Sequence, residues 1–108
     1  MTNADLPAPV QRAVTAATSG DTDGFLAAFG DDGAVDDWGR VFTGPDAIRD
    51  WSDAEFIGKQ VTLDVTAVQT DGDVVTISAQ VGGNGFNGPS HFAFTVHGDR
   101  VALMRITG

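Results

Sequence analysis

The sequence contains no cysteine and no tyrosine, and it has only 6 basic residues. Without cysteine, the chain can form no disulfide bond, no thiolate nucleophile and no cysteine-ligated zinc site. Its 15 acidic residues outnumber the basic ones and give a formal net charge of −9. A surface with this charge repels phosphate backbones, so we expect no nucleic-acid partner.

The sequence also lacks an apolar run that approaches the roughly 20 residues of a membrane-spanning helix. Its first ten residues have neither the basic start nor the apolar stretch of a secretory signal. We therefore expect a cytoplasmic protein with no membrane partner. With 108 residues, 42% of them hydrophobic, the chain is long enough for one domain, residues 1–108, with a core of its own.

Helical periodicity is confined to the first half of the chain. It predicts a first helix between Asp5, a candidate N-terminal cap, and Gly20. A second, short helix is expected between Asp21 and Gly30, since the aspartate can cap it and the glycine can end it. The proline and acidic residue at the start of segment 45–57 predict a third helix there.

Strand periodicity dominates the remainder of the sequence. Residues 34–38 and 40–42 read as a short hairpin, and from residue 61 apolar side chains alternate with polar ones. This alternation, broken by glycine-containing turns, predicts an antiparallel meander over residues 61–67, 75–81, 92–96 and 101–107. Three helices followed by such a meander indicate an α+β domain with the helices on one face of the sheet.

Two patterns that resemble cofactor or metal motifs do not meet the requirements of those sites. Residues 83–88 fit GxGxxG, but they lie between two predicted strands, whereas a dinucleotide site needs a strand followed by a helix. His91 and His97 share a strand face but lie about 20 Å apart in an extended strand, too far for joint metal ligation. We therefore expect no cofactor and no metal.

The acidic segment 31–55, DDGAVDDWGRVFTGPDAIRDWSDAE, holds both tryptophans and the only glutamate. Carboxylates beside large aromatic side chains suit an acid/base site or a pocket for an apolar ligand. Asp37, next to Trp38, is the candidate general base, because an apolar pocket would remove part of its solvation. The alternative is a solvated turn aspartate.

Glu55, with Ser52 one turn earlier on the third helix, is the second candidate acid/base group. The alternative is an exposed helix glutamate paired with Lys59, four residues later. His91 is a further candidate for an acid/base role, although it should lie on the outer face of the sheet.

The predicted pocket is lined by large apolar side chains from the third helix and the sheet. Phe86, on the loop between two strands, could cover a bound ligand. The alternative for the aromatic residues is a purely structural core, and for the loop a simple bend of the sheet. The candidate lining residues are Trp38, Trp51, Ser52, Phe86, Phe92, Phe94 and Met104.

The run FGDDGAVDDWGRVFTGPDAIRDW and the order of elements over residues 6–107 resemble the nuclear transport factor 2-like superfamily, particularly its SnoaL-like branch. The specific part is an acidic strand, a glycine, an aromatic residue and then Gly-x-x-x-Ile-x-x-Trp at the start of a helix. The resemblance implies a cystatin-like cone, in which a strongly bent antiparallel sheet wraps three helices around a pocket. Members include ketosteroid isomerases, polyketide cyclases, dehydratases and epoxide hydrolases, together with non-catalytic binding and dimerisation domains.

An ungapped comparison with ketosteroid isomerase places Asp37 at the position of the catalytic base and Ser52 at that of a supporting tyrosine. The oxyanion donors have no counterpart, because the corresponding positions are Ala13 and Phe92. That enzyme needs a tyrosine and a protonated aspartate there. The resemblance therefore argues against steroid isomerisation by this mechanism.

These observations lead to two functional hypotheses from different classes. In the first, the protein binds a small, largely apolar molecule and uses Asp37 in a cofactor-independent isomerisation, cyclisation, dehydration or hydrolysis. In the second, it is a non-catalytic ligand-binding or dimerisation domain whose carboxylates keep it soluble. In both, the resemblance implies a homodimer formed through the outer face of the sheet.

Overall fold

A computed structural model of the chain describes residues 6–108, so the predicted cap Asp5 lies outside the described residues. The helices are α1 (Ala8–Ser19), α2 (Thr22–Ala27), α3 (Pro45–Glu55) and the short 3₁₀ helix η2 (Ile57–Lys59). As predicted, Gly20 ends α1 in a left-handed conformation with φ 77°, and the Asp21 side chain caps α2 by accepting from Gly24 N at 3.0 Å. Within residues 6–108, no helix has the length and apolar character needed to cross a membrane.

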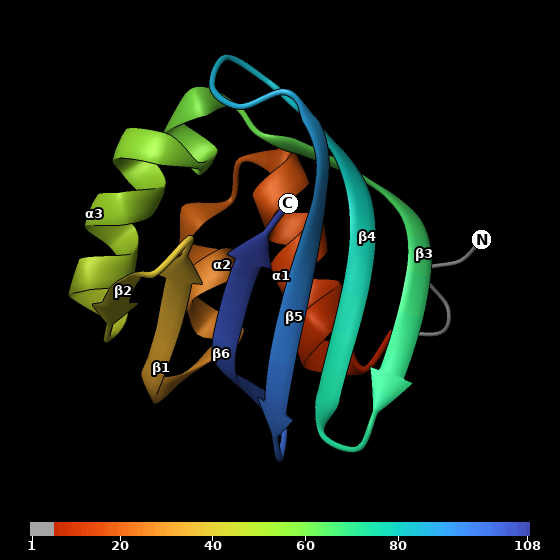
Figure 1. Cartoon of the computed structure of the whole chain (residues 1–108). Helices are drawn as coiled ribbons and strands as arrows, with labels where there is room; N and C mark the ends of the chain where they lie inside the picture. The colour runs from red at the N-terminus through yellow and green to blue at the C-terminus, as the bar shows by residue number, and fades with distance from the viewer. Residues whose placement is uncertain (1–5) are drawn as a thin grey trace.

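Six strands form one sheet in the order β2-β1-β6-β5-β4-β3. Four neighbouring pairs are antiparallel, but β1 and β6 are parallel, so the prediction of a wholly antiparallel sheet is wrong. The reason is topological: α3 carries the chain across to β3 at the far edge, and the meander back brings β6 beside β1 in the same direction (Figure 1). The strands are β1 (Phe29–Asp37), β2 (Arg40–Thr43), β3 (Thr62–Asp71), β4 (Val74–Gly82), β5 (Gly88–His97) and β6 (Arg100–Thr107).

Two predicted helix ends move because of contacts that lie outside the local pattern. The second helix ends at Ala27 rather than at Gly30, since Val101 N of β6 donates to Ala28 O at 2.8 Å and draws Phe29 into β1. The third helix ends at Glu55, and the chain then turns into η2.

The core lies between the helices and the concave face of the sheet, and Figure 1 shows the helices gathered on that one face. Burial follows the strand alternation in β4 and β5, and in β6 the alternation is interrupted once, between Val101 and Met104, where the register with β5 shifts. Aromatic rings continue the core toward the end of α3, where Trp51 and Phe56 stack with centroids 4.8 Å apart. The largest fully buried apolar side chains are Phe25, Phe92, Phe94, Ile48, Ile77, Met104, Val10, Val35 and Val101.

Candidate functional site

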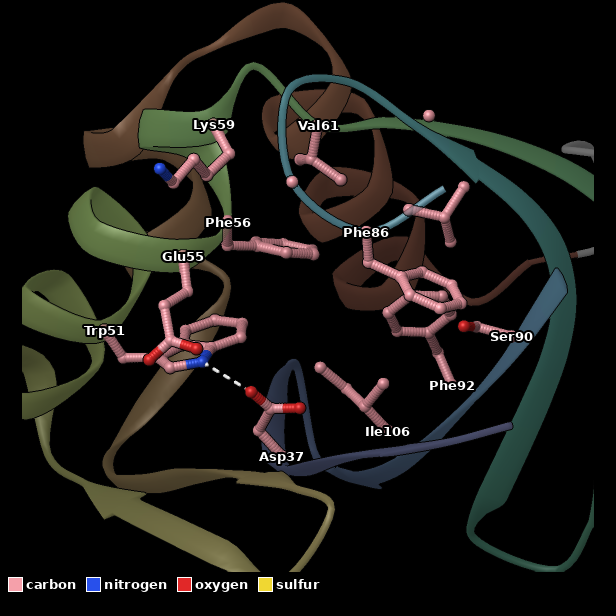
Figure 2. A pocket seen from close by; sticks show the side chains of 13 residues that line it. Asp37, Trp51, Glu55, Phe56, Lys59, Val61, Phe86, Ser90, Phe92 and Ile106 are labelled. Atoms are coloured by element: carbon pink, nitrogen blue, oxygen red, sulfur yellow. Dashed lines mark hydrogen bonds between the residues drawn. The ribbon is translucent and has the colours of Figure 1, made fainter. Parts of the chain in front are cut away.

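A cavity of about 240 Å³ opens between the end of α3 and the loop that joins β4 to β5 (Figure 2). Its inner wall is apolar and buried, and it includes Trp51, Phe56 and Phe92. Its rim is formed by the exposed side chains of Glu55 and Phe86. The volume lies just below the range of about 300–1,000 Å³ usual for ligand pockets, so the cavity fits a small molecule.

Asp37 is the acidic group of the inner wall, and its carboxylate is held at one oxygen only. Oδ2 accepts hydrogen bonds from Trp51 Nε1 at 3.0 Å and from the Arg40 guanidinium at 2.5 Å. Oδ1 has no hydrogen-bond partner among residues 6–108, and in Figure 2 it points away from Trp51, toward Ile106 and the cavity interior. The side chain is 15% exposed. One oxygen is therefore fixed, while the other is available to a ligand.

Strand alternation explains why Asp37, and not its neighbour, faces the cavity. Val35 and Asp37 project from the same face of β1, and Val35 is fully buried. Asp36 projects from the opposite face, where it accepts from Gly39 N at 2.8 Å and lies 3.4 Å from Arg105 Nε. Two adjacent aspartates thus have separate roles: one closes a turn and the other lines the cavity.

Glu55 is paired with Arg40 rather than with Lys59. The guanidinium donates to both carboxylate oxygens, at 2.7 and 2.9 Å, and it also holds Asp37. The hydrogen bond from Arg40 lowers the pKa of Glu55 below its ordinary value. A lowered pKa is the opposite of what a general acid needs near neutral pH. Glu55 therefore belongs to the rim as an ionised carboxylate.

Three of the predicted lining residues are buried but do not reach the cavity. Ser52 is fully buried, and its hydroxyl accepts from Ile57 N at 3.4 Å, so it satisfies the backbone where α3 ends. Phe94 and Met104 are register partners on β5 and β6 and lie within the core. All three were predicted to line the pocket, and that prediction is wrong.

Two further candidates lie on the surface, outside the cavity. Trp38 is 66% exposed and has a left-handed backbone with φ 55°, because it begins the turn between β1 and β2. His91 faces outward from β5, and its Nδ1 lies 3.2 Å from Gly108 O. Trp38 therefore does not line the pocket, and His91 has no access to it.

The cavity also contains residues that the sequence patterns did not single out. Phe56 falls near the end of the predicted helix 45–57, but it lies between α3 and η2 and turns its ring into the inner wall. Ser90 is 4% exposed and shares the inward face of β5 with Phe92. Extending the alternation of that strand back by two residues would have identified it. The wall is completed by Lys59, Val61, Val81, Gly82, Gly85 and Ile106.

The loop between β4 and β5 closes one side of the cavity and is fixed to η2 through backbone contacts. Asn84 N donates to Lys59 O at 2.7 Å. Gly83 has φ 123° and approaches Gln60 so closely that a Cβ there would lie 2.7 Å from its carbonyl oxygen. The anchored loop presents Phe86, which is 59% exposed, at the rim.

The chain matches the family model of the SnoaL-like domain over residues 10–104. A candidate polyketide cyclase from Sinorhizobium meliloti is 28% identical, with 99% of this chain and 100% of that chain covered and a TM-score of 0.88. A protein with a ketosteroid isomerase-like fold from Catenulispora acidiphila, solved in complex with trimethylamine, is 25% identical, with coverages of 94% and 85% and a TM-score of 0.80.

A cystatin-fold protein from Novosphingobium aromaticivorans is 15% identical, with coverages of 93% and 95% and a TM-score of 0.80, which shows the fold alone. No curated protein matches the sequence. The predicted cystatin-like α+β cone is confirmed by these similarities. Because the family model spans most of the sequence, the chain belongs to the SnoaL-like branch of the nuclear transport factor 2-like superfamily.

Proposed function

We propose that this protein binds a small, neutral, largely apolar molecule in the cavity and that Asp37 acts on it as a general base. The observation that carries the proposal is the free Oδ1 of Asp37, which faces an apolar wall while Oδ2 is fixed by Trp51 and Arg40. A carboxylate in a fixed position beside bound substrate is the arrangement that general-base catalysis requires.

The charges beside Asp37 disfavour an anionic ligand at that end of the cavity, although Lys59, which has no ion-pair partner within residues 6–108, also lines the cavity. Asp37 is acceptor-only when ionised, and Arg40 is already engaged by two carboxylates. The formal net charge of −9 further disfavours the approach of anions. The C. acidiphila relative was solved in complex with trimethylamine, so a protein of this fold can bind a small molecule.

Proton abstraction next to a carbonyl group is the chemistry that this arrangement suits best. Asp37 Oδ1 takes a proton from the α-carbon, the C–H electron pair forms a carbon–carbon double bond, and the carbonyl π electrons move to oxygen to give an enolate. In a β,γ-unsaturated ketone the enolate is conjugated, and return of the proton from Asp37 to the γ-carbon isomerises the substrate. In a β-hydroxy ketone the enolate expels the β-hydroxide, which takes the proton from Asp37 and leaves as water. The carboxylate is regenerated in the isomerisation, so that cycle consumes no second reactant.

The test is exchange of the α-hydrogens of 2-tetralone, a small bicyclic ketone, in D₂O, followed by ¹H NMR. We expect the wild-type protein to accelerate exchange and Asp37→Asn to lower the enzymatic rate by about 10²- to 10⁴-fold. Asp36→Asn is the matched control, since it removes the neighbouring carboxylate on the opposite face and should exchange at the wild-type rate.

Exchange that is equally fast in Asp37→Asn would refute the base assignment. Titration of ¹⁵N-labelled protein with the same ketone tests binding separately, through amide shifts at cavity residues such as Phe56 and Ile106. Shifts there without accelerated exchange would support the non-catalytic ligand-binding domain instead. The absence of shifts in the cavity would refute the binding proposal itself.

A further inference from the structure

We propose that Ser90 is the second polar contact of the bound molecule and that its hydroxyl donates a hydrogen bond to a ligand oxygen. The inference rests on the proposed function and narrows its substrate class. The cavity then selects small apolar molecules that carry a carbonyl or other acceptor oxygen at the end facing Ser90 and a removable proton at the end facing Asp37.

The first support is that Ser90 is buried without a protein partner. It is 4% exposed, and its hydroxyl makes no hydrogen bond to another residue in the range 6–108. Every side-chain nitrogen or oxygen in that range that is fully enclosed by protein has a hydrogen-bond partner. Ser90 Oγ has none, so it is not fully enclosed, and solvent or a ligand can reach it through the cavity. In Figure 2 this oxygen points from β5 into the cavity.

The second support is the energetic cost of such a hydroxyl. An uncompensated polar group in an apolar wall costs about 1–3 kcal/mol by protein mutational data. The neighbouring inward positions of the sheet, Ala79 and Phe92, are apolar. Ser90 avoids this cost because its hydroxyl can meet a partner, water or a ligand oxygen, that enters the cavity from solvent.

The third support is the position of Ser90 relative to Asp37. Asp37 pairs with Ile106, and Ile106 pairs with Phe92, which puts these three residues in one row across β1, β6 and β5. Ser90 precedes Phe92 by two residues on the same face of β5. The spacing between strands and the rise per residue then put the backbones of Asp37 and Ser90 on the order of 12 Å apart. Both side chains line the cavity, and a separation of this order can be spanned by a one- or two-ring molecule.

The chemistry of the two groups is complementary. Asp37 Oδ1 can only accept a proton, while a serine hydroxyl can donate to an oxygen lone pair. In the enolate step proposed above, negative charge develops on the ligand oxygen, where a hydroxyl donor would stabilise it. Ser90 is not proposed as a nucleophile, since the adjacent His91 faces the opposite side of the strand.

The experiment compares two probes of the same ring skeleton, 2-tetralone and the hydrocarbon tetralin, which lacks the carbonyl. Dissociation constants are measured by NMR titration of wild type, Ser90→Ala, Ser90→Thr and Ser78→Ala. We expect Ser90→Ala to weaken 2-tetralone binding by about 3- to 10-fold and to leave tetralin binding unchanged. Ser90→Thr keeps the hydroxyl and should retain the preference for the ketone.

Ser78→Ala is the matched control, because Ser78 projects from the outer face of β4 beside His91 and should have the wild-type ratio of affinities. An unchanged ketone-to-hydrocarbon ratio in Ser90→Ala would overturn the role of Ser90 while leaving the cavity as a binding site. Failure of both probes to bind the wild-type protein would overturn the proposed function, and the role of Ser90 with it.

Discussion

At the scale of single residues, Arg40 organises the charges at the mouth of the cavity. It joins a carboxylate of β1 to one at the end of α3, and its own pKa is raised mainly by the hydrogen bond with Glu55. The guanidinium is half exposed, so the three-residue cluster of Asp37, Arg40 and Glu55 meets solvent on one side. Its electrostatic contribution to stability is therefore reduced by screening.

The lowered pKa of Glu55 predicts how this cluster responds to acid. A carboxyl group with a lowered folded pKa stabilises the protein above its ordinary pKa of 4.5, and that contribution is lost as the pH falls through the folded pKa. The difference in unfolding free energy between wild type and Glu55→Gln should be small, largest at neutral pH, and lost as the pH falls below the lowered folded pKa of Glu55. Urea denaturation across this range measures it.

Asp50→Asn provides the control for this prediction, because Asp50 is an exposed residue of α3 that forms no ion pair within residues 6–108. The difference in unfolding free energy between wild type and Asp50→Asn should not show the pH dependence expected for Glu55→Gln. A difference between wild type and Glu55→Gln that is the same at neutral and acid pH would contradict the prediction.

At the scale of elements, the cavity depends on how the β4–β5 loop is fixed to η2. Gly83 lies where the loop crosses the backbone of that short helix, and a Cβ there would be 2.7 Å from Gln60 O and 2.9 Å from Lys59 O. These contacts are with backbone atoms, which cannot rotate away as a side chain can. The loop can keep its place beside the cavity only with glycine at this position.

Gly83→Ala should therefore cost more stability than a glycine substitution in an open turn, and it should also weaken ligand binding by moving Phe86. Gly72→Ala is the control, since Gly72 has φ 61° and nothing within 4 Å of its added Cβ, which limits its cost to about 1–2 kcal/mol. Denaturation midpoints and 2-tetralone affinity measure the two effects. Equal costs for the two variants would show that the loop can shift freely.

At the scale of the whole molecule, acidic residues are distributed unevenly. The chain has 15 of them, yet the three consecutive strands β4, β5 and β6 contain none. Figure 1 shows the described helices on the opposite face of the sheet, so no helix within residues 6–108 covers the outer face of these strands. A second copy of the protein, which carries the same negative net charge, meets less electrostatic repulsion at this surface than at the surfaces formed by the acidic segments.

We therefore propose a homodimer through the outer face of β4–β6 and expect a dimer in sedimentation-velocity measurements. Ala93 lies at the middle of this face, paired with Thr76 and Arg105, and Ala93→Glu should yield a folded monomer. Gln69→Glu adds the same charge on the outlying strand β3 and should leave the dimer intact. A wild-type protein that sediments as a monomer at all concentrations would refute the proposal.

Local pattern predicted most of the fold because helix and strand periods depend on near neighbours in sequence. The helical spacing of Val10, Ala13 and Val14 and the alternation around Phe92 led directly to α1 and β5. The same alternation explains why Asp37 and Asp36 lie on opposite faces of β1. The helix ends at Ala27 and Glu55 were missed, because contacts with β6 and with η2 determine them.

By itself, the sequence determined the order of helices and strands, and its resemblance to a known family indicated the α+β cone. Only the tertiary structure decided that β6 runs parallel to β1, that Arg40 pairs with a glutamate 15 residues away, and that Ser90 meets the cavity while Ser52 does not. These features depend on which elements pack together. The packing of the elements is determined by the burial of the apolar surface of the whole chain, so no short stretch of sequence encodes it.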